Sequence, residues 1–94
     1  MDSKRRRTTI RLGKVFDVPA ARLIENTLKR MGAGDRVRID FGRVHEFHDS
    51  GIAVLAEALG GNGEIVVVLD GLRTHQVRML RYFGIDADAF RPGE

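Results

Sequence analysis

The sequence RVRIDFGRVHEFHDSGIAVLAEAL occupies residues 36–59 and predicts a strand, a loop and a helix in that order. In its first part apolar and polar residues alternate, with Val37, Ile39 and Phe41 on one side of the chain. Successive side chains of a strand point to opposite faces of the sheet. The pattern therefore predicts a strand over residues 36–41, with one buried face and one face in solvent.

The second part of this stretch is typical of an amphipathic helix. Its apolar residues recur three and four positions apart, at Ile52, Leu55, Ala56 and Leu59. That spacing places them on one helix face. The helix is expected to begin at Asp49 or Ser50 and to end at the run Gly60-Gly61-Asn62-Gly63.

Strand and helix patterns also alternate outward from this stretch. Thr8–Leu12 and Ile65–Leu69 are expected to be strands, the second of them covered on both faces because its apolar run is continuous. Helices are expected over residues 17–31 and 74–83. This order predicts a small single-domain α/β fold, with a mixed sheet built from right-handed β-α units and about three helices.

A few residues mark the expected ends of these elements. Asp17 is expected to cap the first helix, whose first turn accepts Pro19. Thr74 is expected to cap the third helix, and Gly84 to close it in a left-handed conformation. The segment Ile85–Phe90 has room for a short extended piece.

The composition favours a globular protein of a reducing compartment. The chain has 94 residues, of which 43% are hydrophobic and 31% charged, and it contains no cysteine. A disulfide framework, a zinc ribbon and a thiol nucleophile are thereby excluded, which favours the cytoplasm. Its apolar runs are too short for a membrane span, and the start MDSKRRR lacks the apolar stretch of a secretory signal.

The positive charge is concentrated at the start of the chain. Sixteen lysines and arginines oppose 13 acidic residues, a net charge of +3. Without Lys4, Arg5, Arg6 and Arg7 the count is 12 basic residues against 13 acidic ones. The basicity is therefore expected in a tail over residues 1–7, and not on a face of the domain over residues 8–94, so no nucleic-acid partner is expected.

The cluster His45-Glu46-Phe47-His48-Asp49 contains residue types of a metal site, but its spacing does not favour one. It lacks the H-E-x-x-H arrangement that places two histidines on one helix face. His48, Asp49 and Ser50 likewise cannot easily form a hydrolase triad as consecutive residues. No glycine run matches a phosphate-binding loop. We therefore expect no catalytic residue, no metal and no cofactor.

The segment Asp49-Ser50-Gly51 lies where the loop passes into the helix. It can simply cap the helix, which stabilises it by about 1 kcal/mol. Alternatively, a serine hydroxyl at a helix N-terminus is well placed for phosphorylation, which adds roughly −1.5 to −2 charge without necessarily melting the helix. Such a switch would act by changing how the helix binds the surface of a partner.

The residues of this region resemble the signature of STAS domains, a family that includes the bacterial anti-sigma factor antagonists. Its members read D-L-S-x-V-x-x-I-D-S-[ST]-G-L-x-x-L, and this chain has DFGRV at residues 40–44 and HDSGIAVL at residues 48–55. Residues 12–17 resemble the family's entry to the first helix, and residues 70–90 its third-helix region. The similarity covers roughly residues 10 to 90.

The resemblance implies a binding module and not an enzyme. Family members of this architecture dock onto an anti-sigma factor that is also a serine kinase, and phosphorylation of the first serine of D-S-[ST]-G releases the partner. The corresponding docking surface here consists of the following residues: His48, Asp49, Ser50, Gly51, Ala53 and Glu57.

Two alignments with the family signature remain open. Without a gap, Asp49 occupies the position of the phosphorylated serine and carries a fixed charge of about −1, a partial mimic of phosphoserine. With a one-residue deletion in the loop, Asp49-Ser50 is the D-S pair and Ser50 is the switch. An unchanged distance from strand to helix favours the ungapped alignment.

The ends of the domain also depart from the family. The N-terminal part has room for one clear strand where members have a pair, and Glu94 lies where the last helix should begin. The domain is thus expected to be truncated at the C-terminal helix, which leaves a surface open to a homodimer or a partner helix.

The expected function is protein–protein interaction in bacterial regulation, with an anti-sigma factor/serine kinase or another regulatory protein as partner. One alternative is a structural or regulatory subunit of a transporter or a stress-signalling assembly. A nucleotide-binding domain is a further alternative, which no phosphate-binding loop supports.

Overall fold

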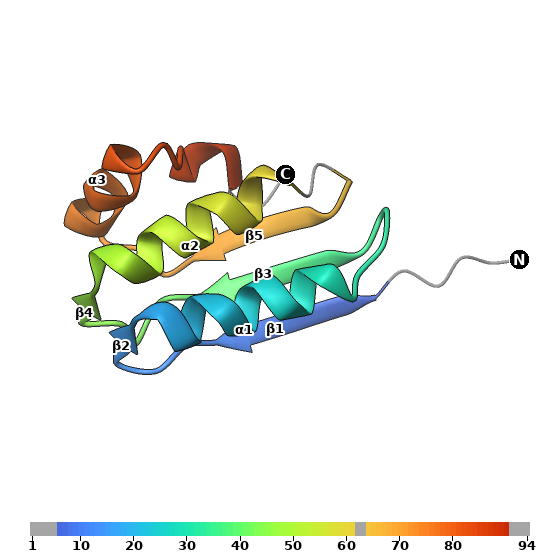
Figure 1. Ribbon diagram of the computed structural model, residues 1–94, viewed down its shortest axis with the longest axis horizontal. Coiled ribbons are helices and arrows are strands. Elements are labelled where there is room, and N and C mark those ends of the chain that lie inside the picture. Colours follow the sequence, from blue (N-terminus) through green and yellow to red (C-terminus); the bar gives the residue numbers. More distant parts are fainter. Residues whose placement is uncertain (1–5, 62–63, 91–94) are drawn as a thin grey trace, which may run out of the picture.

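The computed structural model describes residues 6–61 and 64–90 (Figure 1). The strands are β1 (Arg7–Arg11), β2 (Val15–Phe16), β3 (Arg36–Asp40), β4 (Glu46–Phe47) and β5 (Val66–Asp70). The helices are α1 (Val18–Lys29), α2 (Asp49–Gly60), α3 (Thr74–Tyr82) and the 3₁₀ helix η1 (Ala87–Phe90). Within these residues, every helix falls short of the length and apolar character that a bilayer crossing demands.

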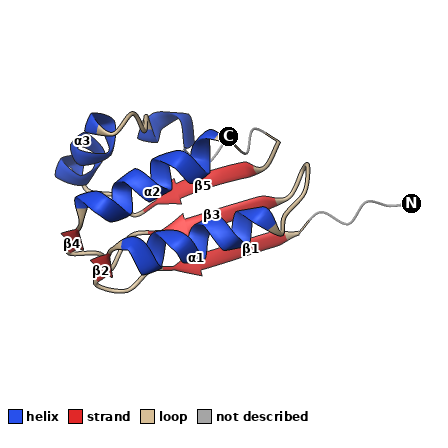
Figure 2. Ribbon diagram, viewed as in Figure 1, coloured by secondary structure: helices blue, strands red, loops and turns tan. Residues whose placement is uncertain are grey.

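The main sheet has three parallel strands in the order β1-β3-β5. The β1-α1-β3 and β3-α2-β5 crossovers are both right-handed, and α1 and α2 lie side by side on one face of the sheet (Figures 1 and 2). The predicted α/β fold with three α-helices is therefore confirmed. All strand pairings among the described residues are parallel, including that of β2 with β4.

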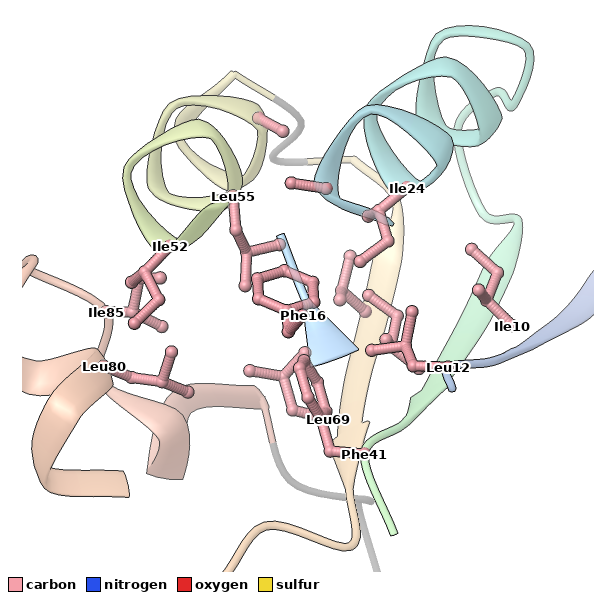
Figure 3. Packing of buried hydrophobic residues seen from close by; sticks show 14 of the residues in the cluster. Ile10, Leu12, Phe16, Ile24, Phe41, Ile52, Leu55, Leu69, Leu80 and Ile85 are labelled. Carbon is pink, nitrogen blue, oxygen red and sulfur yellow. The ribbon is translucent and has the colours of Figure 1, made fainter. Parts of the chain in front are cut away.

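The hydrophobic core lies between the sheet and the two helices (Figure 3). Ile24 and Leu55 point into it from α1 and α2, and Leu69 lies beneath them on β5. Phe16 is completely buried although β2 has only two residues. Burial of such side chains stabilises the fold by roughly 1.5–3 kcal/mol each, so this layer supplies most of the driving force for folding.

Most expected element ends shift by one or two residues, as is usual for the frayed ends of helices and strands. The strand expected over residues 8–12 is β1 at Arg7–Arg11, and the strand expected over residues 65–69 is β5 at Val66–Asp70. Asp17 caps α1 as expected, because its carboxylate accepts a hydrogen bond from the Ala20 amide. Gly84 has a φ angle of 84°, the left-handed closing conformation that was expected.

Three expectations about local structure are wrong, whereas α2 ends at the expected glycine run, with Gly60 as its last residue and Gly61 as its C-cap. Thr74 is the first residue of α3 and not its cap, a position that belongs to Arg73. The segment expected to be extended at residues 85–90 ends in η1. Val66 is 43% exposed, so β5 is not covered on both faces along its whole length.

Some of the expected features involve residues that the structure does not describe. They are Lys4 and Arg5 of the expected tail, Asn62-Gly63 of the glycine run, and residues 91–94, which lie outside the described residues. Arg7, which was assigned to the tail, is the first residue of β1. The folded structure therefore begins before residue 8.

A glycine allows the N-termini of α1 and α2 to meet. A Cβ atom placed on Gly51 would lie 2.7–2.9 Å from the backbone of Asp17, which is closer than real Cβ atoms approach. Gly51 is buried in the first turn of α2, whereas Asp17 precedes α1. Only a residue without a side chain lets the two backbones pack at this distance.

Asp35 ties β1 to the loop between α1 and β3. One carboxylate oxygen accepts a hydrogen bond from the Arg6 amide at 2.9 Å, and the other from the Gly32 amide at 2.8 Å. These two backbone hydrogen bonds hold the pKa of Asp35 below its usual value. The residue is only 7% exposed, so water replaces these donors poorly.

Replacing Gly51 tests the contact between the two helices. We expect Gly51→Ala to reduce the free energy of unfolding by about 2 kcal/mol, because the backbone of Asp17 must shift to admit the methyl group. Gly60→Ala is the matched control in the same helix, since a Cβ there meets nothing within 4 Å. It should be neutral or stabilising by up to about 1 kcal/mol. Equal effects of the two substitutions in urea unfolding would contradict the close contact.

Replacing Asp35 tests the hydrogen bonds that its carboxylate accepts from the Arg6 and Gly32 amides. A carboxyl with a lowered pKa in the folded state stabilises the protein above its unfolded pKa of about 3.9, and this contribution is lost as the pH falls through the folded value. Asp35→Asn should therefore be less stable than the parent at neutral pH, and the difference should narrow below about pH 4. Glu57→Gln, at an exposed position, is the control for urea unfolding at both pH values. A difference that does not change with pH would contradict this role of the carboxylate.

Candidate protein-interaction site

The first half of the loop between β3 and β4 is held by hydrogen bonds to the end of β5 and to the start of α3. The Phe41 amide donates to the Asp70 carbonyl at 2.8 Å, which holds the end of β3 beside β5. The Val44 carbonyl accepts hydrogen bonds of 3.0 Å from both the Gln76 side-chain amide and the Arg73 guanidinium. Gln76 is completely buried, so breaking this contact would leave polar groups unsatisfied.

The second half of the loop is fixed to β2. The Lys14 carbonyl accepts hydrogen bonds from the amides of His45 at 2.8 Å and Glu46 at 3.1 Å. The His48 amide then donates to the Phe16 carbonyl at 2.8 Å. Backbone contacts therefore determine where α2 begins.

Three aromatic rings support the loop from below. Phe16, Phe41 and Phe47 have ring centroids 5.5–5.8 Å apart, the spacing of favourable aromatic pairs. Phe16 and Phe41 are completely buried, and Phe47 is half-buried. The cluster joins the loop, β2 and the end of β3 in one rigid layer.

The first turn of α2 presents two polar side chains to solvent. His48 is at the N-cap position, and its carbonyl accepts from the amides of Gly51 and Ile52. Asp49 and Ser50 follow as the first two helical residues, and both are exposed. No side chain caps α2, so the interpretation of Asp49-Ser50 as a simple cap is wrong. The charge of Asp49 instead complements the helix dipole.

His48 pairs with a carboxylate of the same loop. Its Nε2 atom lies 2.8 Å from Oε2 of Glu46, and the side chains are 45% and 65% exposed. The described hydrogen bonds include none between His48 and Ser50, so the ring does not activate this hydroxyl. Within residues 6–61 and 64–90 no group of histidine and acidic side chains is arranged to hold a metal ion.

The expected docking residues divide into exposed and buried ones. His48, Asp49, Ser50, Ala53 and Glu57 are exposed. Asp49, Ala53 and Glu57 are four residues apart, so they lie on one helix face. Gly51, in contrast, is buried against the backbone of Asp17 and has no surface to offer a partner. Its inclusion among the docking residues is therefore wrong, and it acts by placing its neighbours.

Two further residues border this surface, and only one had a signal in the sequence. Glu46 lies two positions before His48, a spacing that puts both side chains on the same side of an extended chain. Val15 is 38% exposed and lies opposite Glu46 in the β2–β4 pair. A two-residue strand has no periodicity, so this pairing was not predictable. We call the exposed residues Val15, Glu46, His48, Asp49, Ser50, Ala53 and Glu57 the α2 surface.

The comparison with known proteins agrees with this fold and loop. The family model described as "Mlab, STAS domain" matches residues 1–92. No curated protein and no solved structure shows significant similarity to the chain. STAS domains are regulatory and interaction modules. The match spans nearly the whole sequence, and it confirms the resemblance of the loop and helix: the chain belongs to the STAS domain family.

Proposed function

We propose that this chain is an anti-sigma factor antagonist-like module, which docks through the α2 surface onto an anti-sigma factor that is also a serine kinase. The observation that carries the proposal is the exposed first turn of α2 on a loop fixed by backbone hydrogen bonds. A surface that is rigid before binding loses little conformational entropy when a partner docks. The module acts by contact in the cytoplasm and performs no chemistry of its own.

The charge of the α2 surface determines which partner it fits. Glu46, Asp49 and Glu57 are all exposed, and His48 is the basic group among them. Complementary charge fixes the register of a complex and excludes unsuitable partners. A basic patch on the kinase is therefore the expected counterpart. Val15 and Ala53 add apolar area beside these charges.

Ser50 is the modification site of this proposal. Its side chain is exposed in the first turn of α2, where the helix dipole favours negative charge. A phosphate here would leave the helix intact and place a second negative group beside Asp49. The modification would therefore act on the partner surface, by its bulk and by altering the register of the complex.

A constitutive subunit of a transporter or stress-signalling assembly is the second candidate. It is favoured by Asp49 in the ungapped alignment, because this side chain would hold a permanent negative charge at the position that other family members phosphorylate. In that case Ser50 would not accept phosphate. The two candidates therefore differ in whether an anti-sigma kinase binds and modifies the chain.

Intact-mass spectrometry distinguishes the two. The protein is incubated with ATP and each candidate anti-sigma kinase of its own genome, with Ser50→Ala as the control. We expect the mass of one phosphate on the parent and none on the variant. Stable binding to a kinase without a mass change would favour a fixed charge at Asp49. Neither binding nor modification would favour the constitutive subunit.

Substitution of Asp49 tests the docking surface itself. We expect Asp49→Lys to abolish binding to the partner, with a loss of at least about tenfold in affinity, because it reverses the charge at the centre of the surface. Asp49→Ser should instead restore switchable binding, because it puts a serine at the position that other family members phosphorylate. Glu64→Lys makes the same charge change at an exposed site outside the α2 surface and is the control in titration calorimetry. Parent-like affinity of both Asp49 variants would show that docking occurs elsewhere.

A further inference from the structure

The second face of the main sheet is strongly basic. Residues that alternate with the core residues of β1 and β3 point away from α1 and α2, and on these two strands they are mainly exposed arginines. They are Arg7, Arg11, Arg36 and Arg38. The interpretation of the basicity as a terminal tail alone is therefore wrong. The pairing of the strands gathers arginines that are distant in the sequence.

Two of these arginines are direct neighbours. Arg7 and Arg36 are register partners in the β1–β3 pair, so their side chains leave the same face of the sheet beside each other. Neither forms an ion pair with an acidic side chain of the described part of the chain. Like charges directly opposite each other destabilise a sheet. The fold therefore keeps two positive charges on neighbouring positions of the sheet without an acidic partner, at a cost in stability.

A cavity of about 260 Å³ lies at the same place. It is lined by Arg6, Arg7, Gly34, Arg36 and Val66. These residues lie at the amino end of the strands, whereas α2 begins at the carboxyl end, so the cavity and the α2 surface are at opposite ends of the sheet (Figure 1). Arg6 also donates its backbone amide to Asp35, which fixes the chain at the edge of the cavity.

We propose that this arginine cavity binds an acidic polypeptide segment of a partner protein. A guanidinium binds a carboxylate through two parallel hydrogen bonds, and two neighbouring arginines can hold successive carboxylates of an extended chain. The same face already holds one arginine–carboxylate pair, because a guanidinium nitrogen of Arg38 lies 2.6 Å from the Asp70 carboxylate.

Two further observations favour a polypeptide over a nucleic acid. Val66 is 43% exposed in the wall of the cavity and offers an apolar contact that a phosphate backbone does not use. At the opposite end of the same face Asp40 lies beside Arg11 and Asp70 pairs with Arg38, so no excess positive charge continues along the strands for a longer polyanion. The positive region is thus short and bounded, as suits a few acidic side chains.

Fluorescence anisotropy with a labelled octaglutamate peptide tests the proposal on the whole protein at low salt. We expect the double variant Arg7→Gln/Arg36→Gln to bind this peptide about tenfold more weakly than the parent. The control is Arg78→Gln/Arg81→Gln, which removes the same charge from two exposed neighbours on α3 and should change the affinity less than about twofold. An octaglutamine peptide should not bind.

Several outcomes would overturn the proposal. The first is that octaglutamate does not bind. The second is that both double variants lose the same amount of affinity for octaglutamate. The third is that a thymidine octanucleotide binds more tightly than octaglutamate. The second would indicate an effect of net charge, and the third a nucleic-acid surface. Competition by inorganic phosphate at similar concentration would indicate a simple anion site.

Thermal unfolding supplies a measurement that does not depend on a ligand. Because Arg7 and Arg36 repel each other in the free protein, Arg36→Gln should raise the unfolding temperature, whereas Arg78→Gln should not. A lower unfolding temperature of Arg36→Gln would show that this arginine stabilises the fold, and it would contradict a residue retained for binding.

Discussion

The contact between the N-termini of α1 and α2 is the constraint on which the rest of the structure depends. Gly51 lies against the backbone of Asp17, and the His48 amide binds the Phe16 carbonyl beside it. The two helices pack along their length, and together they cover the apolar face of the sheet (Figure 2). This contact sets the position of α2 relative to the loop.

The consequence for function is a separation of tasks within one short segment. Buried residues of the loop and of the first turn of α2 hold the backbone, while Asp49 and Ser50 between them remain free to meet a partner. The arginine cavity lies at the other end of the strands, so a partner on α2 would not cover it. With both proposed sites occupied, this domain would hold two proteins at once, one on the α2 surface and the other at the arginine cavity. Such bivalent contact raises the effective concentration of each partner for the other.

The elements with a clear period were predictable from the sequence, and those defined by pairing were not. The alternation around Ile39 and the helical spacing from Ile52 are local patterns, and both predictions hold. The strands β2 and β4 are too short to show a period, so the support they give to the loop was missed. The burial of Gln76 was missed, because a polar side chain is expected to be exposed to solvent. Its hydrogen bond to the Val44 carbonyl, which allows the burial, is visible only in the structure. The register between β1 and β3 likewise depends on tertiary structure.

Hydrogen exchange of individual amides, followed by NMR, tests the central claim most directly, because it needs no partner. We expect the His48 amide to be strongly protected, because it donates a hydrogen bond to the Phe16 carbonyl. The amides of Asp49 and Ser50, which make no hydrogen bond within the described part of the chain, should exchange rapidly. This contrast between adjacent residues is the signature of a rigid loop that ends in an open helix terminus. Exchange of the His48 amide as fast as that of Ser50 would contradict it and would show that the start of α2 is not held in place.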